Sequence, residues 1–301
     1  MNPKIGIQII AAFMIISMVL SSVIYFIGDD SSDNGDIQSI STVTEDYFNV
    51  GGKLVFHNFK SITDGLQMST PNVTSALFVD VDYINYTASQ TWHEQLSYEI
   101  TTVIQLLSSQ VDDLYQSSTL QMYYAQLPDD EMILLSTMSP KKTPDSFMPA
   151  YSNNGQYIIL ERSFDFSGFN VMGEPTIYTN TRDTAEEIIT IVESWVVPST
   201  GYDIFLPVLN HSDEYSEYQA VNSQVAFADL YYIGIHRNDD DTFTRTTVYL
   251  NASDGCAAHI NELAQSGSER GFSQYDVTLE GDILKVMLTG EFSLVNAEDI
   301  Q

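Results

Sequence analysis

The chain has 301 residues, of which 41 are acidic and 11 are basic, so its formal net charge at pH 7 is −30. A surface of this charge repels nucleic acid and attracts cations, which excludes nucleic acid as a partner. Hydrophobic residues make up 44% of the chain, enough to build a core and to exclude a wholly disordered protein.

The first predicted element is a membrane anchor within residues 1–28. Ile5–Gly28 carries no charged side chain. As a helix, these roughly 24 residues would extend about 36 Å, more than the roughly 30 Å of a bilayer's hydrocarbon core. The run is longer than the core of a signal peptide, and no small-residue cleavage site follows it. We therefore expect one uncleaved transmembrane helix in contact with the lipid bilayer, with a cleaved signal as the alternative.

The charges on either side of this run predict its orientation. Lys4 precedes it, and Asp29, Asp30 and Asp33 follow it. The positive flank of a membrane helix stays in the cytoplasm. We therefore expect a single-pass protein of the cell membrane, with a cytoplasmic N-terminus and an extracytoplasmic C-terminal domain.

Residues 29–49 are rich in Ser and Asp and are predicted to be an acidic flexible linker. The following residues are divided into two α+β lobes, 50–145 and 146–301, because a stretch with Pro and Lys at 140–149 interrupts the pattern. Cys256 is the only cysteine, so an intramolecular disulfide is excluded. This is typical of a prokaryotic envelope protein rather than of a disulfide-rich animal ectodomain.

Hydrophobic periodicity in the first lobe predicts strands and helices in alternation. The strand at 74–84 is the clearest, because apolar residues alternate along it, and the helix at 90–115 has apolar residues at three- and four-residue steps. The elements expected in this lobe are strand 52–59, helix 61–68, strand 74–84, helix 90–115, and strands 120–126 and 132–138.

The second lobe is expected to contain two hairpins. Asn238–Asp241 would close the first and Gly281–Asp282 the second. The elements expected in this lobe are strands 156–161 and 175–178, helix 183–195, strands 202–208, 229–236 and 242–250, helix 255–264, and strands 275–280 and 283–289. The fold class is therefore an α+β ectodomain, mixed and mainly antiparallel with a few helices, behind one N-terminal transmembrane helix.

Three sets of residues are candidates for chemistry. Asp80 and Asp82 alternate on one predicted strand, so both carboxylates would lie on one face, as paired acid–base groups or cation ligands do. Half-exposed strands show the same alternation without any activity. Cys256 and His259 are three residues apart on a predicted helix, where a thiol and a base could pair or ligate zinc. A lone helical Cys is more often a small core residue.

Cation and glycan sites are the remaining candidates. Asp239, Asp240 and Asp241 form a hairpin tip that could hold Ca²⁺, although no cofactor is otherwise expected. Asn-x-Ser/Thr sequons make the chain a candidate glycoprotein, and they occur at Asn72, Asn85, Asn210 and Asn251.

The sequence contains no complete nucleophile elbow, phosphate-binding loop or zinc-protease helix. We therefore expect an acidic, membrane-anchored extracytoplasmic protein with a binding or structural role at the cell envelope, whose partners are other envelope proteins or cations. A non-enzymatic role is favoured over catalysis, and the question is left open. Two alternatives stay open. One is a tethered hydrolase whose site combines carboxylates and a His from distant segments, and the other is a cation-binding surface domain.

Overall fold

A computed structural model describes residues 52–87, 109, 111–113, 115–140, 148–151, 156–162, 168–194, 196–213 and 215–299. The expected transmembrane helix, the linker and most of the helix expected at 90–115 lie outside these residues. Among the helices that the structure does describe, none is both long and apolar enough to cross a membrane. The chain divides into two compact units, 1–49 and 50–301, and the fold that follows is that of the second.

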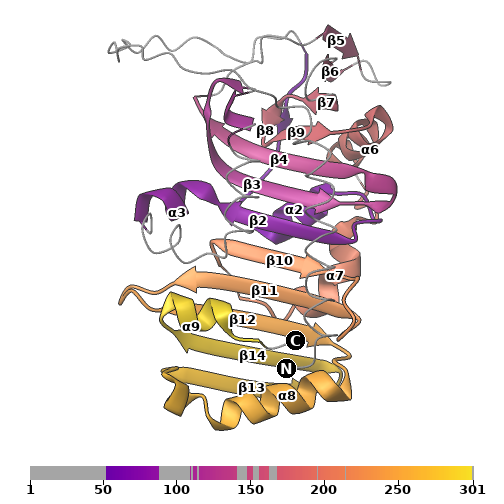
Figure 1. The fold of residues 1–301 in the computed structure, drawn as a ribbon. Coiled ribbons are helices and arrows are strands. Elements are labelled where there is room, and N and C mark those ends of the chain that lie inside the picture. The colour runs from indigo at the N-terminus through magenta and orange to yellow at the C-terminus, as the bar shows by residue number, and fades with distance from the viewer. Residues whose placement is uncertain are drawn as a thin grey trace, which may run out of the picture. The chain divides into compact units, whose positions relative to one another are not determined.

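The second unit is built on one sheet of twelve strands in which neighbouring strands pair antiparallel (Figure 1). From one edge to the other, its strands are β13 (Gln274–Glu280), β14 (Ile283–Gly290), β12 (Phe243–Leu250), β11 (Leu230–Arg237), β10 (Tyr218–Asn222), β2 (Ser75–Asp80), β3 (Ser118–Gln126), β4 (Met132–Ser139), β9 (Thr176–Thr179), β7 (Gly168–Val171), β6 (Ile158–Arg162) and β5 (Met148–Tyr151). A separate parallel pair joins β1 (Val55–Phe56) to β8 (Gly173–Glu174).

Segments far apart in the chain meet at the middle of the sheet. β2 pairs with β3 on one side and with β10 on the other, and the β2–β10 register sets Val79 opposite Tyr218. β4 pairs with β9, so strands from both sides of the expected boundary at 140–149 lie in the same sheet. Whether residues 50–145 and 146–301 fold as two independent lobes is a separate question, and that division stays a prediction.

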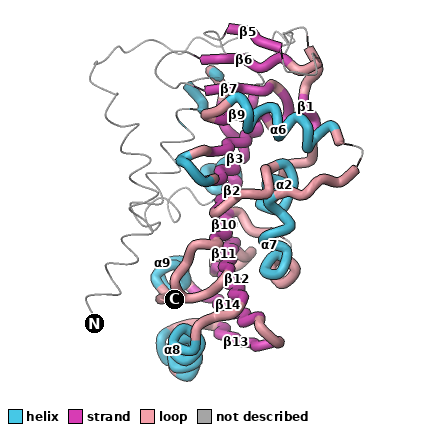
Figure 2. The backbone as a smooth tube through the Cα atoms, turned by 90° about the vertical axis from the view of Figure 1, so that its right-hand side faces the viewer, coloured by secondary structure: helices cyan, strands magenta, loops and turns pink. Residues whose placement is uncertain are grey.

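Helices lie on both faces of the sheet (Figure 2). One face carries α2, α6 and α7, while α8 and α9 lie on the other. α3 follows β2 directly and contacts β3. The helices are α2 (Ile62–Met68), α3 (Val81–Thr87), α6 (Arg182–Glu193), α7 (Gly201–Leu209), α8 (Asp254–Gln265) and α9 (Phe292–Ala297). The described part of the chain is thus α+β and mainly antiparallel.

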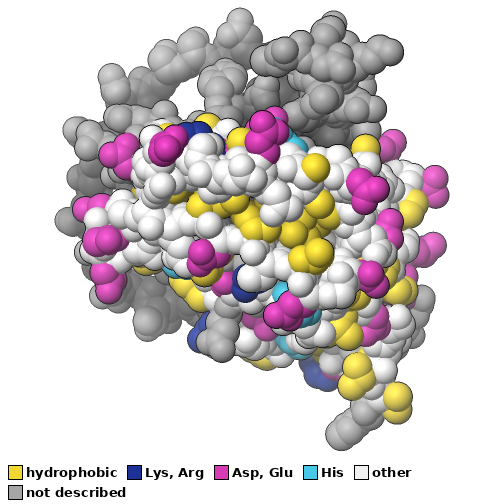
Figure 3. Space-filling model, turned by 90° about the horizontal axis from the view of Figure 1, so that it is seen from below, with side chains coloured by type: hydrophobic (Ala, Val, Ile, Leu, Met, Phe, Trp, Pro, Cys, Tyr) yellow, Lys and Arg dark blue, Asp and Glu magenta, His cyan; other side chains and the backbone are white. Residues whose placement is uncertain are grey.

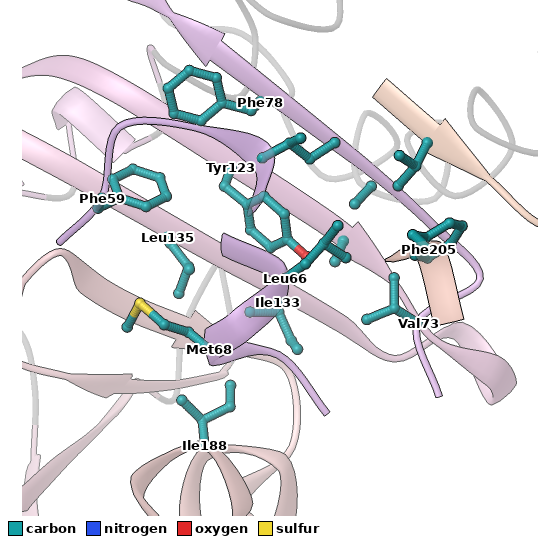
Figure 4. Close-up of a cluster of buried hydrophobic side chains, with 14 of the residues drawn as sticks. Phe59, Leu66, Met68, Val73, Phe78, Tyr123, Ile133, Leu135, Ile188 and Phe205 are labelled. Atoms are coloured by element: carbon teal, nitrogen blue, oxygen red, sulfur yellow. The ribbon is translucent and has the colours of Figure 1, made fainter. Parts of the chain in front are cut away.

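The main core lies between the sheet and the helices α2, α6 and α7 that cover one of its faces (Figure 4). Cross-strand register puts Phe78, Tyr123 and Leu135 in one row on this face. Leu66 from α2 and Phe205 from α7 pack against this cluster, and both are fully buried. Burying side chains of this size stabilises the fold by about 1.5–3 kcal/mol each. The short helices are therefore held in place by tertiary packing rather than by their own helical stability.

Several sequence expectations are confirmed. The helices expected at 61–68, 183–195 and 255–264 correspond to α2, α6 and α8, and both hairpins of the second lobe form as β11–β12 and β13–β14. The strands expected at 120–126, 132–138, 156–161 and 175–178 correspond to β3, β4, β6 and β9, while only residues 55–56 of the strand expected at 52–59 are paired as strand β1. Helical backbone at 111–113 and 115 agrees with the end of the helix expected at 90–115.

The strand expected at 202–208 is wrong, because these residues belong to helix α7. Alternating apolar side chains suggested a strand, but the buried residues Gly201, Phe205, Val208 and Leu209 recur at helical spacing. The Asp203 carboxylate accepts the Thr200 N–H at 3.0 Å, which satisfies one of the free amides at the helix start. β10, in contrast, was not expected at all.

Candidate functional site

Asp80 and Asp82 do not share a strand face. β2 ends at Asp80, and α3 begins at the next residue, so the strand expected to continue to 84 is wrong beyond this point. The Asp80 carboxylate accepts the backbone N–H of Tyr83 at 3.0 Å, the usual contact of a helix N-cap. Asp82 lies exposed in the first turn of α3. Its negative charge there interacts favourably with the positive N-terminal end of the helix dipole, which stabilises α3.

The second oxygen of Asp80 faces other polar groups of the sheet. Gln121 on β3 and the hydroxyl of Tyr215 both donate to Asp80 Oδ2, each at 3.4 Å. Gln121 in turn accepts from the Thr137 hydroxyl at 3.4 Å. The capping carboxylate is therefore also the centre of a polar cluster at the end of β2.

Glu217, which the sequence analysis did not select, completes this cluster. It is 1% exposed and stands immediately before β10, where its backbone carbonyl accepts the Asp80 N–H at 2.8 Å. Its carboxylate accepts the backbone N–H of Arg237 at 3.2 Å. Burial, with a smaller contribution from the Asp80 charge, raises the pKa of Glu217 to about 7 despite the hydrogen bonds that oppose the shift. Glu217 therefore titrates near neutral pH.

These residues belong to a longer polar row on one sheet face. Strand register places Gln121 opposite Asp80. Tyr218 pairs with Ile235, so the next residues along these two antiparallel strands, Glu217 and His236, also lie opposite each other. His236 has a buried Nδ1 atom without a hydrogen-bond partner among the described residues. In strand order from β4 to β13, the polar row consists of Thr137, Gln121, Asp80, Glu217, His236, Thr244, Thr289 and Gln274.

The structure places Cys256 and His259 on α8, as expected, and Asp299 lies near both of them. Cys256 is buried, and burial, together with the nearby Asp299 charge, raises the pKa of its thiol to about 11. The His259 ring donates from Nε2 to the Asp299 backbone carbonyl at 3.0 Å. A nucleophilic thiol requires a lowered pKa, so this environment is the opposite of an activated cysteine.

We expect Cys256 to be nearly inert in the folded protein. At pH 8, a thiol-specific chromogenic reagent should modify it about 100-fold or more slowly than in the unfolded chain, because both the thiolate fraction and access are reduced. The measurement is the rate of reagent release with and without denaturant. Equal rates under the two conditions would contradict both the burial of Cys256 and its raised pKa.

The three Asp residues at the β11–β12 tip have partners within the hairpin. Asp240 Oδ1 accepts the Thr242 N–H at 3.1 Å and the Thr242 hydroxyl at 2.6 Å, and these hydrogen bonds lower the pKa of Asp240. Asp241 forms an ion pair with Arg237. Asp239 is exposed. Two of the three carboxylates thus stabilise the turn, in the way that Asp commonly does.

The sequons lie at several kinds of local structure. Asn72, Asn210 and Asn251 are exposed, while the side chain of Asn85, within α3, lies outside the described residues. The Asn251 amide donates to the Asp229 carboxylate at 2.7 Å. This side chain therefore links the residue after β12 to the residue before β11.

Acidic side chains are spread around the face seen from the β13 end, with few Lys or Arg between them (Figure 3). Within the described ranges, no three His, Cys, Asp or Glu side chains gather as a metal-ion group. Comparison with known proteins finds no matching family model, no matching curated protein and no matching solved structure.

Proposed function

We propose that the chain is a single-pass membrane protein whose acidic α+β domain has a binding or structural role at the cell envelope, outside the cytoplasm. The observation that carries this proposal is the uncharged run Ile5–Gly28, with Lys4 before it and Asp residues after it. The acidic surface of the second unit supports it, because such a surface recruits cations and cationic partner segments by long-range attraction.

The local chemistry also favours a binding role over catalysis. Asp80 is engaged as a helix cap, and Cys256 is a buried thiol with a raised pKa. His259 donates to a backbone carbonyl. Each of these contacts stabilises the domain, and none of them activates a nucleophile.

The anchor is tested with the full chain expressed in bacterial cells. The protein should remain in the membrane pellet after an alkaline carbonate wash, and protease added outside spheroplasts should digest the domain. A variant with Ile15→Asp and Ile16→Asp should appear in the soluble fraction, because charges in the hydrocarbon core are costly. Wild-type protein that washes off the membrane, or that resists external protease until the cells are lysed, would contradict the proposal.

A tethered hydrolase is the second candidate, and Glu217 is the observation that favours it. A carboxyl group with a pKa of about 7 beside a second carboxylate, Asp80, is suited to general acid–base work near neutral pH. The test is a panel of peptide, glycan and ester substrates with wild-type protein and Glu217→Gln. Under the binding proposal neither protein shows turnover, whereas turnover that Glu217→Gln abolishes would replace it with the hydrolase.

A further inference from the structure

Two consecutive valines project from the connection between α6 and α7. Val196 is 77% exposed and Val197 is 93% exposed, so nearly all of both side chains is in contact with solvent. Residues 194–202 carry no charged side chain, although the chain as a whole has a net charge of −30. Single exposed apolar residues are common on proteins, whereas an adjacent pair in an uncharged stretch forms a small apolar patch. We call Val196 and Val197 the valine tip.

The valine tip is held between two helix ends that are fixed to the domain. After α6, the Ser194 hydroxyl donates to the Val196 carbonyl at 2.6 Å. At the start of α7, the Gly201 N–H donates to the Ser69 carbonyl at 3.1 Å. The described part of this connection lies on the side of α6 and α7 that faces away from the sheet (Figure 2). The tip is therefore directed outward from the helices rather than onto the core.

The chain enters the domain beside the valine tip. The Lys53 ammonium forms an ion pair with Glu193, the last residue of α6 and only three residues before Val196. It also lies 5.3 Å from the centre of the Tyr157 ring. The Lys53 backbone N–H donates to the Gln156 carbonyl at 2.8 Å. These three contacts fix the start of the described domain at the end of α6, next to the tip.

This position matters because residues 29–49 are predicted to link the domain to the membrane, so the inference rests on the anchor proposed above. A flexible chain of roughly 21 residues has an r.m.s. end-to-end distance of about 25 Å. Such a short tether would give the surface beside Lys53 a high effective concentration at the bilayer. Of the domain's surfaces, the one that the tether would keep nearest the membrane thus includes an exposed, uncharged apolar tip.

The chemistry of the valine tip fits a lipid surface. Apolar side chains that enter the boundary between headgroups and acyl chains leave water, while acidic side chains elsewhere on the domain stay solvated. The ion pair with Lys53 also offsets the charge of Glu193, the acidic residue nearest to the tip in the sequence before it. We propose that the valine tip inserts shallowly into the bilayer that holds the anchor and thereby orients the domain on the membrane.

The proposal is tested with the full chain reconstituted into phosphatidylcholine vesicles. Val197→Cys supplies one accessible thiol for a polarity-sensitive fluorophore, because the native Cys256 is buried. Lipids with a spin label near the top of the acyl chain should quench this fluorophore at least about twofold more strongly than the same fluorophore on Asp239→Cys, since interfacial apolar groups reach that depth. Asp239 is exposed at the β11–β12 tip and is the matched control position. Equal quenching at the two positions would overturn the proposal.

A second change tests the apolar side chain itself. Val196→Asp beside the labelled residue should reduce quenching to the control level, because a charge is costly in the hydrocarbon, whereas Val196→Leu should keep it. Val196 is exposed, so neither change removes core packing. Quenching that Val196→Asp leaves unchanged would count against the tip. A blue shift that grows with protein density but is insensitive to lipid quencher would overturn lipid contact and indicate a second copy of the chain.

Flotation of the same vesicles separates this inference from the anchor. A chain that floats with the vesicles but carries an unquenched label at position 197 refutes the valine tip and leaves the anchor standing. A chain that does not float refutes the anchor and, with it, this inference.

Discussion

Replacing Gly65 by Ala is expected to lower the free energy of unfolding by about 2 kcal/mol or more, although the same change at an exposed helix position raises that free energy by about 1 kcal/mol. Gly65 lies inside α2, and a Cβ there would be 2.4 Å from a ring carbon of Tyr123. The ring is fully buried, and its hydroxyl is hydrogen-bonded to Ser69 at 2.9 Å, so it has little freedom to move aside. Overpacking therefore outweighs helix propensity at this position.

The measurement is urea unfolding of the wild type and the variant, with Gly255→Ala as the matched control. Gly255 is exposed in the first turn of α8, and a Cβ there meets nothing within 4 Å. The control should gain about 0.5–1 kcal/mol. A Gly65→Ala protein as stable as the control would show that α2 does not pack on Tyr123 in the way described.

Glu217→Gln is expected to make the protein more stable at pH 8 and to leave it nearly unchanged near pH 4.5. The pKa of Glu217 is raised from 4.5 to about 7, so the folded state holds this proton more tightly than the unfolded chain does. Its contribution to stability is complete below about pH 4.5 and is lost as pH rises to 7. The loss is at most about 3 kcal/mol, and less where solvent screens the carboxylate. Gln is neutral throughout, so the variant does not suffer this loss.

The measurement is Tm from pH 4.5 to pH 8, compared between the two proteins at each pH because other carboxylates also contribute to the absolute curve. Glu280→Gln, on the exposed edge strand β13, serves as the control and should follow wild type. A difference between wild type and Glu217→Gln that does not change with pH would mean that Glu217 titrates at its usual value.

The sequence predicted best those elements whose signals are local. The β11–β12 and β13–β14 hairpins combine alternating side chains with short polar turns, and α8 has Ser253 as an N-cap that accepts the Cys256 N–H. Prediction failed where two periodicities compete. α7 alternates as a strand does, and only its buried face shows the helical spacing. β10 is short, and its place depends on two strands from distant parts of the chain.

The polar sites were harder to predict, for a different reason. Asp80 was selected for a carboxylate pair on a strand, yet its own capping of α3 ends that strand. Glu217 stands in a polar stretch, and nothing in its neighbours indicates that it is buried. Gly234 did carry a signal, because a glycine within a strand often marks a place where other atoms approach the backbone closely. The sequence alone could not show that those atoms are the hydroxyls of Tyr232 and Ser216.

The place of β2 in the sheet has a consequence for how a newly made chain reaches its fold. One edge of β2 pairs with β3, which follows it early in the sequence. The other edge of β2 pairs with β10, which begins only at Tyr218. Synthesis proceeds from the N-terminus, so a growing chain presents β2 with one open edge until more than half of the protein has emerged. Open edges pair readily with other chains. We therefore expect chains truncated before Tyr218 to aggregate, and binding factors that cover exposed strands to raise the yield of full-length protein.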